Sequence, residues 1–291
     1  MPPKDRYWLH ILLFVLTLGT TTVCGAEWIN GSPAVFLLHD VWHFMPREDL
    51  LKGFRYSLPF ITFLLCHEFG HYFTSRFHRV RASLPYCLPV YFPFSFGTFG
   101  AIIRMRERVN SSLKYFDIGI AGPVAGFIIG GIVLVYGFTH LPDLSYIYNI
   151  HQEYRSYGGF PPKEFYQSLP DPSIRLGKSL LLFLMERIFA FHSPLMPNGY
   201  EMPHYPFLFA GWLACFFTAL NLFPMGQLDG GHIVYGLFGS RIHSWVSRLV
   251  FLALVFYGGI GLIDLSGTLL HTAISGGMYL IFLQFLFRKA F

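Results

Sequence analysis

The chain has 291 residues, of which 53% are apolar and 13% are charged. Soluble domains carry about 25% charged residues, so this composition argues against an ordinary cytosolic enzyme. Lysine and arginine total 21 against 16 acidic residues, a formal charge of +5, and the basic residues form short clusters between apolar runs. That distribution indicates membrane topology signals and not a basic face for nucleic acid, so no nucleic-acid partner is expected.

Apolar stretches near the length needed to cross a bilayer, about 20 residues, recur along the chain. They predict an all-α polytopic membrane protein in which residues 1–291 form a single membrane-embedded domain, with the lipid bilayer as its surroundings. The six predicted spans are residues 7–26, 57–75, 118–138, 205–223, 249–264 and 265–287.

The distribution of lysine and arginine predicts the orientation of these spans. With the N-terminus in the cytoplasm, the basic clusters fall on the cytoplasmic side, and residues 139–204 form an outer segment in which acidic residues dilute the basic ones. Both termini are then cytoplasmic, in a bacterial inner membrane or an organellar membrane. An alternative for the first span is a cleaved secretory signal, although its apolar length favours a retained helix.

Residues 84–103, between the second and third spans, contain three prolines and many aromatic residues. A continuous helix is excluded there, so a short β-like or re-entrant membrane-associated segment is expected. Within it, residues Gly97, Thr98, Phe99 and Gly100 are predicted to bind substrate by adding an extended strand, and a tight turn between two strands is a compatible alternative.

Small residues and amphipathic periodicity mark two further elements. Glycines recur at helical spacing along the third span, which predicts close helix packing rather than chemistry; they are Gly119, Gly122, Gly126 and Gly130. In the outer segment, apolar residues at helical spacing within 173–191 predict a helix that lies in the membrane interface.

The sequence His67-Glu68-Phe69-Gly70-His71 carries the clearest chemical signal. Positions i and i+4 of a helix share one face, so the two imidazoles can reach one metal ion while the intervening glutamate accepts a proton from metal-bound water. A solvated helix face is the ordinary explanation of such a pattern, but here it lies in an apolar span. Because ionisable groups inside a membrane are costly, the metal hypothesis is favoured.

Catalytic zinc sites use three protein ligands and leave one position for water, so a third ligand must come from elsewhere. Asp229 is the best candidate, because it follows 24 uncharged residues and is surrounded by proline and glycine, which allow close backbone approach. Alone, it could equally be an aspartate at a loop tip; the two histidines favour a ligand. His232 is expected to support the site or to lie at the interface.

Two motifs together resemble the site-2 protease family of intramembrane zinc metalloproteases. They are HEFGH at residues 67–71 and NLFPMGQLDGG at residues 221–231, and the likeness extends to the first span, to residues 83–102 and to FDIGIAGPVAGF at 116–127. The outer segment is too short for a PDZ domain and few residues follow the last span, so a form without PDZ and CBS domains is expected.

The resemblance implies a metalloendopeptidase that cleaves a peptide bond within or beside a transmembrane helix of a membrane-anchored protein substrate. It implies one zinc per chain held by His67, His71 and Asp229, zinc-activated water with Glu68 as general base, and Asn221 near the substrate or the oxyanion. Two alternatives remain from the residues: a membrane metal transporter, which would show repeats and has no need of Glu68, and a non-catalytic relative that binds membrane helices.

Overall fold

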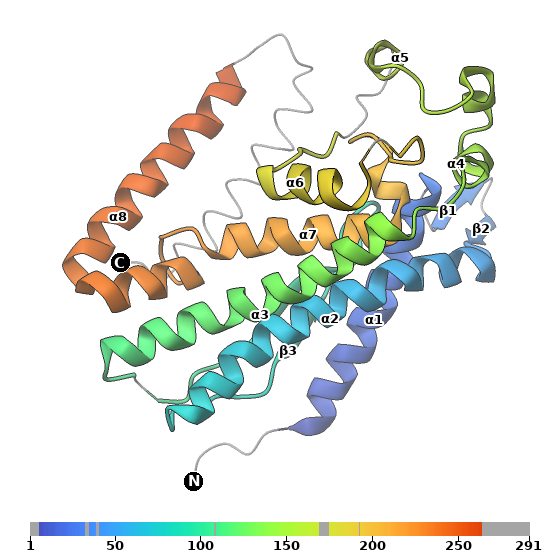
Figure 1. The fold of residues 1–291 in the computed structure, drawn as a ribbon. Coiled ribbons are helices and arrows are strands. Elements are labelled where there is room, and N and C mark those ends of the chain that lie inside the picture. The colour runs from blue at the N-terminus through green and yellow to red at the C-terminus, as the bar shows by residue number, and fades with distance from the viewer. Residues whose placement is uncertain are drawn as a thin grey trace. The chain divides into compact units, whose positions relative to one another are not determined.

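The structure is a computed structural model that describes residues 6–32, 35–38, 41–107, 109–168, 175–191 and 193–263. Helices dominate these residues (Figure 1), as the sequence predicts. The chain divides into two compact units that alternate along the sequence. The first unit comprises Met1–Phe69, Ser83–Arg104 and Ala125–Phe216, and the second comprises Gly70–Ala82, Met105–Val124 and Phe217–Phe291.

The long helices match the predicted spans to different degrees. Helix α1 (Tyr7–Asn30) and helix α3 (Ser112–Thr139) contain the first and third predicted spans, and both are long and apolar enough to cross a membrane by length and composition. Helix α2 (Arg47–Phe77) contains the second predicted span and helix α7 (Pro206–Asn221) most of the fourth. The fifth overlaps the end of helix α8 (Asp229–Ile263), and residues 265–287 lie outside the described residues. Six membrane crossings therefore remain a prediction.

Glycines bring the helices of the first unit into close contact. A Cβ atom at Gly53 of α2 would lie 2.1 Å from the carbonyl oxygen of Thr22 in α1. A Cβ atom at Gly211 of α7 would lie 2.6 Å from the Leu134 side chain of α3. Both contacts leave no room for a larger residue, so α2 packs closely against the backbone of α1, and α7 against a side chain of α3, at these points.

The segment predicted to be β-like forms an antiparallel pair of strands, β3 (Tyr86–Pro89) and β4 (Thr98–Ile102), in the first unit. The pair packs against α1 (Figure 1). Gly97 adopts a positive φ of 80°, and a Cβ atom there would lie 2.3 Å from Thr21 Cα. A second hairpin, β1 (Val35–Leu38) and β2 (Val41–Phe44), follows α1 and has no counterpart in the sequence prediction.

The outer segment consists of short elements in the first unit. The helix predicted within residues 173–191 is present and begins after Ser179, whose hydroxyl accepts a hydrogen bond from the Leu182 amide and caps the helix. The elements of this segment are α4 (Leu144–Ile150), the 3-10 helix η1 (Gln152–Tyr157), α5 (Lys163–Gln167), α6 (Leu180–Phe189) and the 3-10 helix η2 (Met202–His204).

In the second unit, α8 packs against the beginning of α3. A Cβ atom at Gly236 would lie 2.8 Å from the Phe116 amide nitrogen. Further along, α8 is kinked at Gly239, whose φ of 77° and ψ of 176° are not helical. Only glycine adopts this backbone readily, so the sequence places the kink.

Replacing Gly53 by alanine should destabilise the protein, because the new methyl group meets the backbone of α1. Overpacking of this kind typically costs about 1–3 kcal/mol. Gly19 of α1 is the matched control, because a Cβ atom there has no neighbour within 4 Å. Thermal unfolding of the purified variants should show a lower midpoint for Gly53→Ala and no loss for Gly19→Ala. Equal midpoints would contradict the α1–α2 contact.

Candidate metal centre

The two motif histidines lie on consecutive turns of α2, which is unbroken through residues 67–71. The i, i+4 spacing places them on one face of the helix. His67 is 3% exposed and His71 is 6% exposed, so both imidazoles are buried. Because both imidazoles are buried, the motif does not form a solvent-exposed helix face.

In the second unit, the His71 ring lies between a backbone carbonyl and a carboxylate. Its Nδ1 is 2.6 Å from the Ile118 carbonyl oxygen of α3, and its Nε2 is 3.2 Å from Asp229 Oδ1. Because a carbonyl oxygen can only accept, Nδ1 carries a proton. In the neutral ring, Nε2 then directs a lone pair toward the carboxylate, an arrangement that needs a proton or a cation between them. A metal-ligating histidine commonly donates its other ring N–H to a carbonyl in this way.

The local sequence positions Asp229 at the first turn of α8, where the helix dipole favours a negative charge. The preceding turn folds tightly against this helix end. A Cβ atom at Gly230 would lie 2.1 Å from the Leu222 carbonyl oxygen, and one at Gly231 would lie 2.5 Å from the Gly226 carbonyl oxygen. The Asp-Gly-Gly sequence therefore lets the backbone approach closely enough to direct the carboxylate to His71.

Two glycines of α3 lie against the motif histidines, in agreement with the predicted close helix packing. A Cβ atom at Gly122 would lie 2.0 Å from His71 Nε2 in the second unit. In the first unit, one at Gly126 would lie 3.1 Å from His67 Nδ1. The spacing of these glycines can be read from the sequence, but their contacts with the two histidines cannot.

Glu68 and Asn221 are the two residues that the sequence predicts to act in catalysis. Glu68 is half-buried on α2 and interacts electrostatically with the Cys87 thiol of β3. Asn221 is the last residue of α7 and is half-buried. Their catalytic roles stay predictions.

The four predicted substrate-binding residues differ in accessibility. Gly97 packs against α1, where its carbonyl oxygen accepts a hydrogen bond of 2.6 Å from Thr20 Oγ1. Thr98 is buried and donates a hydrogen bond to the Leu88 carbonyl oxygen. Phe99 is 72% exposed, and a Cβ atom at Gly100 would have no neighbour within 4 Å. The first two residues therefore hold the strand pair in place, and the latter two are accessible.

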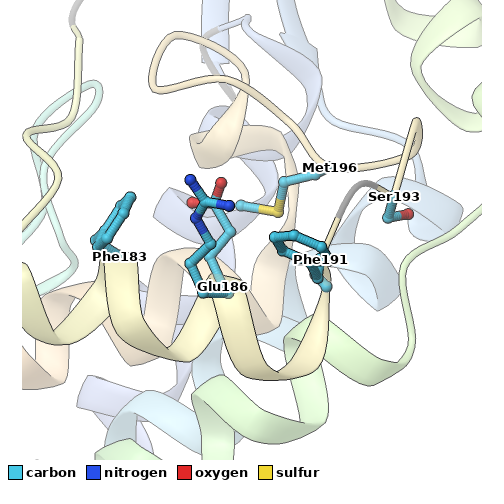
Figure 2. Close-up of a pocket in the computed structure, with 7 residues that line it drawn as sticks. Phe183, Glu186, Phe191, Ser193 and Met196 are labelled. Atoms are coloured by element: carbon cyan, nitrogen blue, oxygen red, sulfur yellow. The ribbon is translucent and has the colours of Figure 1, made fainter.

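A surface pocket lies on α6 and the loop after it, away from the motif residues in sequence. Figure 2 shows Phe183, Glu186 and Phe191 among its lining residues. The Arg187 guanidinium lies over the Phe183 and Phe191 rings, 5.3 and 5.1 Å from their centroids, and Glu186 pairs with Lys178. These two charged side chains therefore have partners, and none of the lining residues belongs to the HEFGH motif or is Asp229.

The sequence comparisons identify the family of the chain. Residues 56–260 match peptidase family M50, and the chain belongs to this family. The match contains both motifs, so the resemblance to site-2 proteases is confirmed at the level of the family. Family M50 consists of peptidases, which favours an enzyme over the transporter and the non-catalytic alternatives.

Several curated plant proteins are similar over nearly the whole chain. Identity is 27% to "Probable zinc metalloprotease EGY1, chloroplastic" of Arabidopsis thaliana, over 96% of this chain and 47% of the relative. It is 26% to "Probable zinc metalloprotease EGY2, chloroplastic" of Oryza sativa subsp. indica, over 97% and 48%. The chain therefore spans about half the length of these relatives. No solved structure matches it.

Replacing Gly122 by alanine should remove metal binding, because the methyl group would occupy the space of the His71 ring. Gly131 of the same helix is the matched control, because a Cβ atom there has no neighbour within 4 Å. Metal analysis of variants purified in detergent should show a lowered metal-to-protein ratio for Gly122→Ala and an unchanged ratio for Gly131→Ala. A full metal content in Gly122→Ala would refute this assignment of the site.

Proposed function

We propose that this chain is an intramembrane zinc endopeptidase that cuts a membrane-anchored protein within or beside its transmembrane helix. The observation that carries the proposal is the pairing of His71, on the HEFGH helix α2, with Asp229 of α8, while a backbone carbonyl oxygen accepts from His71 Nδ1. Membership of family M50 and similarity to proteins named zinc metalloproteases support it.

The donor set fits zinc. Two imidazoles and one carboxylate are the ligands of many catalytic zinc sites, which keep a further position open. His67, His71 and Asp229 would hold one zinc ion at this centre, and both imidazoles are buried. Bound zinc lowers the pKa of water and polarises a carbonyl group, which is the chemistry that peptide hydrolysis needs.

The protein's own residues would supply the proton transfer and the stabilisation of the oxyanion. Glu68 follows the first ligand directly, so its carboxylate lies beside the ligand face and would accept the proton of the attacking water. It would then return that proton to the leaving amine. Asn221 would donate a hydrogen bond to the oxyanion that develops on the scissile carbonyl.

The strand pair β3–β4 supports a route for substrate recognition. A transmembrane helix hides its carbonyl groups in internal hydrogen bonds, so the substrate must unwind before cleavage. An unwound segment would extend along β4 as an added strand, with Phe99 and Gly100 as the accessible contacts. The electrostatic interaction of Glu68 with Cys87 supports a location of this strand pair near the general base.

The membrane topology is part of the proposal. Helices α1 and α3 would cross the membrane, and α2 would place its ionisable motif inside it, which is costly unless the groups bind a metal or one another. The relatives are named chloroplastic, which favours the organellar alternative for a photosynthetic host.

Replacing Glu68 by glutamine should lower cleavage of a single-span model substrate by about 10²- to 10⁴-fold, the usual contribution of a general base. Bound metal should remain, because Glu68 is not a ligand. Glu48→Gln is the matched control, because Glu48 is an exposed carboxylate of the same helix. His71→Ala and Asp229→Asn should lose both metal and cleavage.

Two outcomes would overturn the proposal. Full turnover by Glu68→Gln with metal bound would exclude its role as base. Zinc uptake into proteoliposomes by both the wild type and Glu68→Gln, without any cleavage, would favour a transporter.

A further inference from the structure

A second group of metal-ligating side chains lies in the outer segment, within the first unit. His151 follows α4, Glu201 precedes η2, and His204 ends it. The two Nε2 atoms are 3.3 Å apart, and Glu201 Oε2 lies 3.9 Å from His151 Nε2 and 3.8 Å from His204 Nε2. Three potential ligand atoms therefore converge on one point.

Hydrogen bonds on the far side of each ring fix the direction of its lone pair. His204 Nδ1 lies 2.7 Å from the Ile29 carbonyl oxygen at the end of α1, and His151 Nδ1 lies 3.3 Å from Glu153 Oε1. Both partners accept, so both Nδ1 atoms carry protons. In the neutral rings, the two Nε2 lone pairs then face one another, which is unfavourable without a positive charge between them.

The carboxylate of Glu201 is an independent sign of a missing ligand. Its side chain is 3% exposed. Oε1 accepts a hydrogen bond of 2.7 Å from the Tyr154 hydroxyl, whereas Oε2 is buried with no hydrogen-bond partner among the described residues. A buried carboxylate oxygen without a partner is costly, and this one is directed toward both Nε2 atoms.

A proton shared by the two rings would be the alternative to a metal. A proton between two nitrogen atoms 3.3 Å apart would leave Glu201 Oε2, 3.8 and 3.9 Å from them, without a hydrogen bond, whereas a metal ion would bind all three atoms. Neutral imidazole is the form that binds metal.

The separations fit a tetrahedral metal centre. Zinc bonds to nitrogen and oxygen of about 2.0–2.2 Å place neighbouring ligand atoms about 3.3–3.6 Å apart, so shifts of a few tenths of an ångström would close the site. The ligands also have the supports that such sites use: a carbonyl oxygen behind His204, a carboxylate behind His151 and a hydroxyl on Glu201. His151 is 29% exposed, which gives the ion a path from solvent.

We propose that His151, Glu201 and His204 bind one divalent transition-metal ion, zinc by its preference for imidazole and carboxylate, at a site separate from the HEFGH centre. The ion would join the turn after α4 to the turn before α7. Through His204 and the Ile29 carbonyl it would also stabilise the end of α1, so its role would be structural. The full chain would then bind two zinc ions.

Metal stoichiometry of the full chain in detergent, stripped with chelator and reloaded with Zn²⁺, tests the site without relying on activity. The His67→Ala/His71→Ala double variant should retain one zinc per chain. Adding Glu201→Gln should reduce this to none, whereas adding His140→Ala, which changes an exposed histidine outside the cluster, should leave it at one. Reloading with Co²⁺ should give the visible absorption of a low-coordinate site only where His151, Glu201 and His204 are all present.

A milder variant keeps the proposal falsifiable if Glu201→Gln fails to fold. Tyr154→Phe removes only the hydroxyl that holds Glu201, and should weaken Zn²⁺ affinity by about tenfold, the lower range for such supporting groups. No stoichiometric zinc in the double variant, or full zinc in its Glu201→Gln derivative, would overturn the proposal. An unchanged affinity in Tyr154→Phe would also contradict it. None of these results depends on the HEFGH centre.

Discussion

The contact between His71 and the glycine face of α3 is the constraint on which the candidate centre depends. The imidazole occupies space that any side chain at position 122 would fill, and the Ile118 carbonyl fixes the ring on its other side. A buried imidazole and a carboxylate are unfavourable in an apolar helix pair unless something compensates them. The geometry therefore favours a bound cation, and the glycines are as necessary to it as the ligands.

The candidate ligands could be singled out from the sequence because the pattern is local, and their role as ligands stays a prediction. Two histidines four residues apart share a helix face whatever the rest of the fold does, and Asp229 stood out as a carboxylate after a long uncharged run. The family match is consistent with this reasoning. The strand pair between α2 and α3 was also expected, since prolines exclude a helix there.

Other features depend on contacts distant in sequence and could not be predicted. Glycines at helical spacing predict close packing but not which helix they contact. The contact between Gly122 and His71 therefore could not be predicted from the sequence. The contact of Gly97 with α1 likewise cannot be predicted from the sequence. Of the four residues predicted to bind substrate, only Phe99 and Gly100 are accessible. Of the spans predicted from hydropathy, the first and third lie in helices that are long and apolar enough to cross a membrane, α1 and α3, and their crossing stays a prediction.

The cluster of His151, Glu201 and His204 was even harder to predict from the sequence. His151 lies about fifty residues before Glu201 and His204, and the three match no short ligand motif. Only folding brings them together beside the end of α1, and only the hydrogen bonds behind each ring show where the lone pairs point. Zinc in this chain would then serve two separate purposes, hydrolysis at one centre and structure at the other.

Anomalous diffraction at the zinc absorption edge, from crystals of the zinc-loaded protein, would locate the ion at the HEFGH centre. We expect an anomalous peak between His71 Nε2 and Asp229 Oδ1, about 2.0–2.2 Å from each. A direct hydrogen bond between these two atoms, with no anomalous peak beside them in crystals that contain zinc elsewhere, would contradict it.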